Sequence, residues 1–306
     1  MTRLAFALRS AAISFRPMRR AGVGTCLPLL FLLAAGASGQ PEEPFRPKGI
    51  YNNSVHRFHP DLDARLNVVR FARWRALEIA WTSGVTDELD REIYAYIASL
   101  MKRPPRFPPE ADRVAPLLAR DAVPIFRALR WGQTLEQQLL DVLASSDAEK
   151  RLSAARLERA LLLHRRERWA LSEPAEPSPG GTSGAAVAWR IEVLGMRLCV
   201  RAAADLTTPD FAQQRWRVKQ TIADFDRTYE GDYPAGEATY AAAAPAVAEA
   251  FPGIAQALDR VEQLRRDVLE ALIPGGATLQ ARRQRDERLR AVARRYGLPA
   301  EGIGER

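Results

Sequence analysis

Apolar residues recur every three or four positions along most of this chain, and runs of alternating apolar and polar residues are rare. The three-to-four spacing places side chains on one face of an α-helix, whereas strands alternate with a period of two. Segment after segment beyond residue 60 shows the helical spacing. The pattern predicts an all-α protein, an irregular bundle of about seven to nine helices.

Several expected helices carry their own start and stop signals. Asp61 to Thr82 has large apolar residues on more than one side, which indicates burial on more than one side. Thr86 is expected to cap the next helix, which ends at Pro104-Pro105. Thr208-Pro209-Asp210 combines an N-cap, a first-turn proline and an acid, and predicts another helix start. Further helices are expected at 111–143 (one or two, bent at the prolines and Gly132), 147–171 and 254–272.

One stretch, Ala188 to Arg201, alternates as a strand does. A lone strand needs partners for its backbone groups, and no other stretch offers one. The sequence therefore favours a helix here, with a strand as the alternative.

Prolines and glycines mark the expected boundaries between regions. Pro174 to Gly184 contains three prolines and three glycines without apolar periodicity, which is typical of a linker. The predicted organisation is a signal segment at 1–37, helical regions at 38–172 and 185–275 around a linker at 173–184, and a basic helix and tail at 276–306.

The first 37 residues have the composition of an export signal. They carry five arginines and no acidic residue, followed by the apolar run Leu27 to Ala35 and the triplet Ala35-Gly36-Ala37. Because that run is shorter than the roughly 20 residues that span a bilayer, we expect a cleaved signal and a periplasmic or secreted protein. An uncleaved anchor and a mitochondrial presequence are the alternatives, and a start at Met18 would leave a compact signal.

Removing the signal segment changes the charge of the protein. Without its five arginines, the formal net charge falls from +8 to +3. Residues 276–306 hold eight arginines against four acidic residues, so positive charge gathers in the tail. Only four of the 45 basic residues are lysines, an arginine bias typical of a GC-rich genome. The arginine count is therefore weak support for nucleic-acid binding, and we expect no nucleic-acid partner.

The number and positions of the cysteines limit the disulfides that the chain can form. Cys26 lies in the signal segment, so the expected mature chain keeps only Cys199 and closes no internal disulfide. The neighbours Leu198 and Val200 predict a buried thiol. An intermolecular bridge is the alternative in an oxidising compartment.

His56 and His59 lie three residues apart, just before a helix that begins with Asp61 and Asp63. Zinc and iron sites use these residue types, although they need three or four converging ligands. The one other histidine, His164, lies far along the chain. His56 and His59 are therefore candidate metal ligands, and a polar loop that caps the helix is the other interpretation. The sequence predicts no cofactor.

The strongest basic clusters are Arg165 to Arg168 and the tail helix. The candidate partner-binding residues of the tail helix are Arg282, Arg283, Arg285, Arg288, Arg294 and Arg295. Leu289, Val292 and Tyr296 form a narrow apolar stripe on the same helix. Such a helix can bind an acidic protein surface or anionic lipid headgroups, and a solvated charged face is the alternative. Pro274-Gly275-Gly276 predicts that this helix is separate from the helical body, so that its removal leaves the fold intact.

Tyr233 to Thr239, with the alanine-rich stretch after it, resembles the Pro-Ser-Gly-His segment of the phosphatidic acid phosphatase and vanadium haloperoxidase superfamily. Those enzymes are helical and transfer phosphoryl groups with histidines. Here Glu237 stands at the place of the first histidine, and Thr228 replaces a proline of the upstream element. Arg266 matches the later arginine, but Leu272 stands at the nucleophilic histidine. The resemblance implies a phosphatase-like protein that has lost its activity.

Other catalytic motifs are missing from the sequence: haem attachment, a phosphate-binding glycine loop, His-Glu-x-x-His and Gly-x-Ser-x-Gly. The sequence therefore favours an exported, non-catalytic helical protein, an accessory or scaffold protein that contacts a partner protein or an anionic membrane. A metal-binding or enzymatic protein centred on His56 and His59 is the rival hypothesis.

Overall fold

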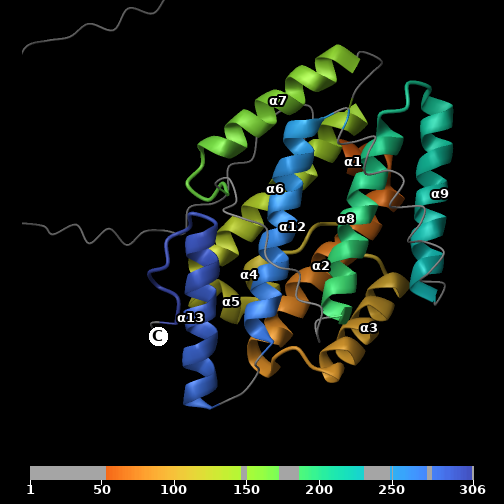
Figure 1. Ribbon diagram of the computed structural model, residues 1–306. Helices are drawn as coiled ribbons and strands as arrows, with labels where there is room; N and C mark the ends of the chain where they lie inside the picture. Colours follow the sequence, from red (N-terminus) through yellow and green to blue (C-terminus); the bar gives the residue numbers. More distant parts are fainter. Residues whose placement is uncertain are drawn as a thin grey trace, which may run out of the picture. The chain divides into compact units, whose positions relative to one another are not determined.

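The computed structural model describes residues 53–145, 150–171, 186–230, 249, 251–273 and 278–304, all within one unit of the chain, Glu43–Arg306. Every regular element in these ranges is an α-helix (Figure 1). The helices are α1 (Ser54–Phe58), α2 (Pro60–Ser83), α3 (Asp87–Lys102), α4 (Ala111–Val114), α5 (Pro116–Asp121), α6 (Val123–Ser145), α7 (Lys150–Arg166), α8 (Ala186–Leu206), α9 (Phe211–Glu230), α12 (Pro252–Leu272) and α13 (Leu279–Arg295). The predicted all-α class is confirmed. The described ranges hold eleven helices rather than seven to nine, because α1, α4 and α5 are separate short helices.

Helix α2 is the central packing element, as its apolar residues on more than one side predicted. It contacts α1, α3, α4, α5, α8, α9 and α12. Its buried residues divide between two hydrophobic clusters. The first cluster joins α2 to α3, α4, α5, α6, α12 and α13, and the second joins it to α1, α6, α7, α8, α9 and α12. Helices from both sides of the predicted 173–184 linker therefore share both clusters, and the linker itself lies outside the described residues.

Two glycines allow helices to approach more closely than a side chain would permit. A Cβ on Gly195 of α8 would lie 2.3 Å from Val69 Cγ1 and 2.6 Å from Arg73 Cζ on α2. A Cβ on Gly132 of α6 would lie 2.4 Å from Val261 Cγ1 on α12. Gly132 lies inside the continuous helix α6, where the lack of a side chain allows the close approach of α12.

The starts of α3 and α9 show how well the sequence predicted the capping residues. The Thr86 side chain accepts a hydrogen bond from Leu89 N, at 3.4 Å, and caps α3 as predicted. Helix α9 begins at Phe211, and Asp210 Oδ1 accepts from Gln213 N at 2.6 Å. Asp210 is therefore the cap rather than Thr208, and the predicted start is moved towards the C-terminus. The alternating stretch after Ala188 belongs to α8, so the helical interpretation is confirmed.

Two short helices are held by carboxylates from other helices. Asp141 of α6 accepts hydrogen bonds from Asn53 N (3.1 Å) and Val55 N (3.0 Å) at the start of α1. Glu78 of α2 accepts from the backbone N of Leu117 and Leu118 at the start of α5. These long-range caps satisfy amide groups that a helix start leaves without intrahelical partners.

Helix α13 is part of the core. Leu289, Ala293 and Tyr296 are almost completely buried in the first cluster, together with Ile303 beyond the helix. The Tyr296 hydroxyl donates to Asp267 Oδ2 of α12 at 2.9 Å. This corrects the expectation that the proline-glycine break separates the tail helix from the body.

Two other predictions concern segments outside the described residues: the signal segment 1–37 and the phosphatase-like segment Tyr233 to Thr239. Among the helices that are described, none combines the length and the apolar character that a membrane span requires.

Candidate functional site

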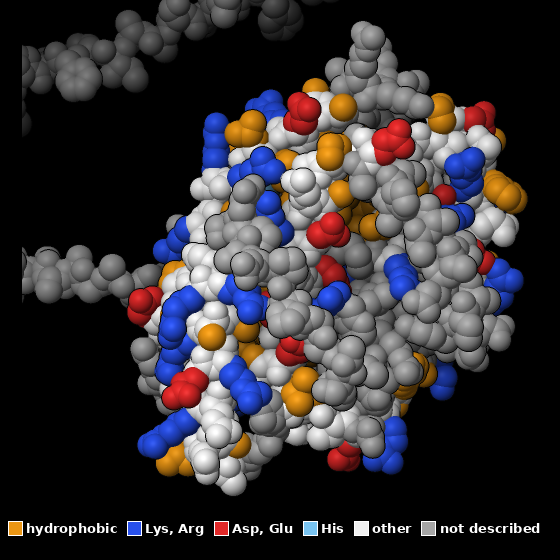
Figure 2. Space-filling view, in the orientation of Figure 1, with side chains coloured by type: hydrophobic (Ala, Val, Ile, Leu, Met, Phe, Trp, Pro, Cys, Tyr) orange, Lys and Arg blue, Asp and Glu red, His pale blue; other side chains and the backbone are white. Residues whose placement is uncertain are grey.

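Some of the tail arginines are exposed, and others contact residues elsewhere in the protein. Arg282, Arg283, Arg288 and Arg294 are exposed on the outer face of α13. Figure 2 shows Lys and Arg side chains gathering over this helix, at the left of the view. Leu289, Val292 and Ala293 of α13 are buried in the core, so the outer face of the helix presents mainly charge to solvent, with Leu279 exposed at its first turn.

Arg285 and Arg295 are committed to contacts within the protein. Arg285 Nε and Nη2 donate to Asp286 Oδ1 at 3.0 and 2.9 Å, and Nη1 donates to the Trp81 carbonyl at 3.3 Å. Its guanidinium also stacks over the Trp81 ring, 4.0 Å from the centroid. Arg295 Nη1 donates to Asp267 Oδ2 at 2.9 Å. These two arginines fasten α13 to α2 and α12.

A cavity of about 530 Å³ opens at the start of α13, beside the end of α2, helix α5 and the C-terminal turn. Its lining residues are Trp81, Thr82, Leu117, Arg120, Asp121, Leu279, Arg282, Arg283, Arg285, Asp286 and Gly304. Three of the predicted partner-binding arginines therefore lie around one cavity.

The cavity lining carries an excess of positive charge. It contains four arginines and two aspartates, a formal net charge of +2. Arg120 forms a two-pronged contact with Asp121, at 2.6 and 2.9 Å, and Arg285 is held by Asp286. Within the described part of the chain, the Arg282 and Arg283 guanidinium groups have no hydrogen-bond or ion-pair partner. The excess charge therefore belongs to these two side chains.

The C-terminal turn closes one wall of the cavity. Gly304 N donates to the Asp121 carbonyl at 3.0 Å, and Arg290 Nη2 donates to the Ile303 carbonyl at 2.6 Å. Gly304 has a positive φ of 72°, and an added Cβ would lie 2.2 Å from Asp286 Oδ2. Glycine fits because it tolerates this backbone conformation and leaves room for the carboxylate.

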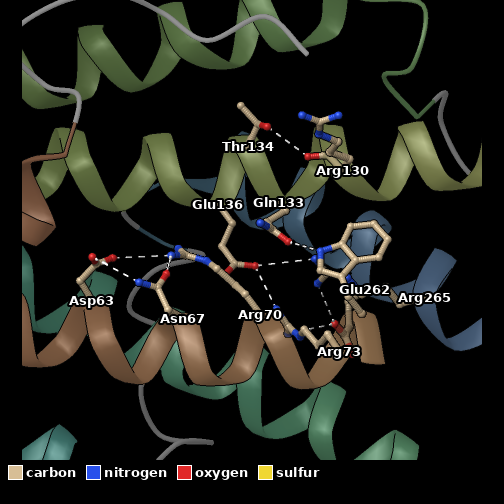
Figure 3. Close-up of polar contacts among 11 residues, drawn as sticks. Asp63, Asn67, Arg70, Arg73, Arg130, Gln133, Thr134, Glu136, Glu262 and Arg265 are labelled. Carbon is tan, nitrogen blue, oxygen red and sulfur yellow. Dashed lines mark hydrogen bonds and ion pairs between the residues drawn. The ribbon is translucent and has the colours of Figure 1, made fainter. Parts of the chain in front are cut away.

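A second charged cluster is buried between α2, α6 and α12 (Figure 3). Glu136 is only 2% exposed, and Arg73 Nη1 donates to its Oε2 at 3.1 Å. Arg70 Nε and Arg265 Nη2 each lie 3.9 Å from this carboxylate. Burial alone raises the pKa of Glu136, but Arg73, Arg70 and Arg265 together lower it below its ordinary value.

Two further acids balance the three arginines of this cluster. Glu262 Oε2 lies 3.6 Å from both Arg73 Nη2 and Arg265 Nη1, and Asp63 Oδ1 lies 3.6 Å from Arg70 Nη1. Three positive and three negative groups thus offset one another inside the bundle. We interpret the cluster as a structural ion-pair network that fixes the relative positions of three helices, because its charges balance and leave none to attract a ligand.

The two candidate metal ligands have separate surroundings. His56 Nδ1 lies 2.9 Å from Asp63 Oδ2, and its ring stacks on Phe107 at a centroid distance of 5.6 Å. His59 is buried, and burial lowers its pKa, with a smaller opposing effect from a hydrogen bond to Gln214. In the described ranges, no group of three or more histidines, cysteines or acids is placed to hold a metal ion. The metal site remains a prediction from the sequence.

The remaining histidine and cysteine are buried. The His164 ring stacks on Trp131, with a centroid distance of 5.0 Å and an interplanar angle of 3°. Cys199 is a buried free thiol, as its neighbours predicted, and burial raises its pKa well above the ordinary value.

Sequence reasoning missed both the ionic cluster and the cavity wall. Arg70 and Arg73 interrupt the apolar stretch of α2, and a charge with apolar residues on every side was the available signal for burial. The positions of Trp81, Leu117 and Gly304 at the cavity had no local signal, because they come from three distant segments.

Comparison with known proteins identifies no relative: no family model, curated protein or solved structure matches this chain.

Proposed function

We propose that this is a non-catalytic, exported docking protein that binds an acidic partner protein through the exposed arginines of α13. The observation that carries the proposal is the excess charge beside the cavity, where Arg282 and Arg283 have no partner in the described ranges. A surface that concentrates one sign of charge attracts an opposite surface at long range and orients it before contact.

An acidic protein is favoured over an anionic membrane as the partner of α13. A helix that lies on a membrane inserts an exposed apolar face between the lipids. Leu289 and Val292 of α13, and Tyr296 at its end, are buried in the core instead, and Leu279 is the large apolar residue that α13 exposes. A single exposed leucine at one end does not make an apolar face along the helix, so α13 offers mainly charge to a partner.

Pull-down from native extract tests the docking proposal. The mature full chain is compared with a variant in which Arg282, Arg283, Arg288 and Arg294 are changed to Gln. The matched control changes four exposed arginines elsewhere to Gln: Arg91, Arg103, Arg159 and Arg217. Both variants lose the same charge. If the partner binds the exposed face of α13, only the α13 variant should fail to recover it.

The expected partner is one acidic protein that is recovered at low salt and released as salt rises, because screening weakens contacts between exposed charges. Recovery of the same protein by all three chains would overturn the proposal. Equal loss in both variants would show that net charge acts rather than this face.

A further inference from the structure

We propose that the cavity at the start of α13 is the specificity pocket of this docking surface, and that it receives a partner segment with two carboxylates flanking an apolar side chain. The inference rests on the proposed function and names the chemistry that the cavity would recognise.

The charge of the pocket fits two carboxylates. Arg282 and Arg283 are adjacent on α13, and neighbouring helical positions point in directions about 100° apart. Their guanidinium groups therefore approach the cavity from two directions, and each has a planar fork that matches one carboxylate. Asp121 and Asp286 are already paired with Arg120 and Arg285. The positive charge available to a ligand is thus that of Arg282 and Arg283.

The helix end increases the preference for an anion. Arg282 and Arg283 lie near the start of α13, where the helix dipole is positive, and the first turn contains no acidic residue. Cations at this end of a helix are unfavourable, so a bound carboxylate would relieve the repulsion. Binding would then stabilise α13 as well as the complex.

The size and the apolar lining of the pocket favour a ligand that carries an apolar group as well as carboxylates. The cavity of about 530 Å³ lies within the range of roughly 300–1,000 Å³ that is typical of ligand pockets. Trp81 and Leu117 line it, and Leu279 is 66% exposed at its edge. Burying this apolar edge would contribute to affinity, so an apolar residue between the two acids completes the match.

The pocket is built on fixed residues. Trp81 is buried and held under the Arg285 guanidinium, and Asp286 is buried beside Gly304. Gly304 is also anchored to α5 through the Asp121 carbonyl. Less ordering of the site is then needed on binding, which favours affinity.

Fluorescence anisotropy at low salt with a labelled, end-blocked peptide containing Glu-Leu-Glu tests the inference. The full mature chain should bind this peptide. Gln-Leu-Gln and Glu-Gly-Glu peptides should bind at least about tenfold more weakly, because lost charge-assisted hydrogen bonds or apolar burial of about 1.4 kcal/mol correspond to that factor. An Arg282→Gln, Arg283→Gln variant should lose about 10- to 100-fold in affinity for Glu-Leu-Glu.

The matched control is Arg91→Gln, Arg159→Gln, which removes the same charge from exposed positions on α3 and α7, outside both the cavity and α13. It should change the affinity by less than about threefold. Circular dichroism should show unchanged folding in both variants, because none of these four side chains makes an interaction in the described ranges.

Three results would overturn the pocket: no binding of Glu-Leu-Glu, equal effects of the two double variants, or equal binding of the Glu and Gln peptides. Binding of inorganic phosphate alone, or of anionic phosphatidylglycerol vesicles alone, would overturn it in favour of those anions. The pull-down separates the two proposals. If the four-arginine variant loses the native partner while the peptide result fails, the docking surface stands and the pocket chemistry is wrong.

Discussion

At the scale of the residue, the environment of His164 decides its charge. The ring lies flat against Trp131, and the Trp131 Nε1 donates to the His164 carbonyl at 3.0 Å. Burial, with a smaller effect from Arg165, lowers the pKa of His164 to about 4. The neutral form is therefore the native form at neutral pH, and protonation of this ring opposes folding.

We predict that His164 makes the protein sensitive to mild acid. The unfolded chain binds the proton near pH 6.5 and the folded chain near pH 4, so the free energy of unfolding falls as pH drops between these values. The full loss from this group is about 3 kcal/mol. A His164→Phe variant keeps an aromatic ring and the backbone carbonyl but removes the titration. Urea unfolding across this pH range should show a smaller loss in the variant, and equal losses would contradict the assignment.

At the scale of the element, the buried ionic cluster joins helices that are distant in sequence. Arg70 and Arg73 reach from α2 to Glu136 on α6, and Arg265 reaches it from α12. An ion pair inside a bundle gains strength from the low dielectric, but each ion costs several kcal/mol to remove from water. Such a cluster contributes little net stability when complete and is costly to break. Its main effect is to fix the register of the three helices, because a shifted helix would leave a buried charge uncompensated.

Replacing Glu136 by Gln should destabilise the fold by about 3–5 kcal/mol, because three buried arginines would face only two acids. The matched control is Glu110→Gln, whose partner Arg113 is exposed, as Glu110 itself is. That pair is worth less than about 1 kcal/mol. Denaturant unfolding of both variants measures the two losses of unfolding free energy. Similar small losses would show that Glu136 is not the centre of the ion-pair network.

At the scale of the whole molecule, the C-terminal region completes the core while presenting its charge outward. The inner face of α13 meets α12 through Tyr296 and Asp267, and its outer face carries Arg282 and Arg283. The C-terminal turn then covers the first cluster with Ile303. One helix therefore serves both stability and the proposed docking.

Removal of residues 276–306 should unfold the protein rather than leave a stable body. Each large apolar side chain withdrawn from the core costs about 1.5–3 kcal/mol, and Leu289, Tyr296 and Ile303 are all removed. The sum approaches the roughly 5–15 kcal/mol that holds a whole domain. Circular dichroism melting and limited proteolysis should show lost cooperativity. A cooperative melt close to that of the full chain would contradict the structural role of α13.

The sequence predicted those parts of the structure that depend on local interactions. The apolar spacing identified most of the long helices, and Thr86 marked a helix start correctly because a cap bonds to an amide three residues away. Arg282 and Arg283 were identified as candidates because the concentration of charge along one helix can also be read from the local sequence. The Thr208 start failed because two neighbouring polar residues competed for one cap, and Asp210 took it.

What the sequence by itself determined is the helical class, the long helices and the basic character of the tail, since each follows from contacts within about one helical turn. Only the tertiary structure decided the rest. The short helices α1 and α5 depend on Asp141 and Glu78 from other helices, so no local cap announced them. The tertiary structure likewise placed Arg70 inside the bundle and Arg282 outside it. Residues of one type in similar helical sequence differ because distant segments supply acids to one and solvent to the other.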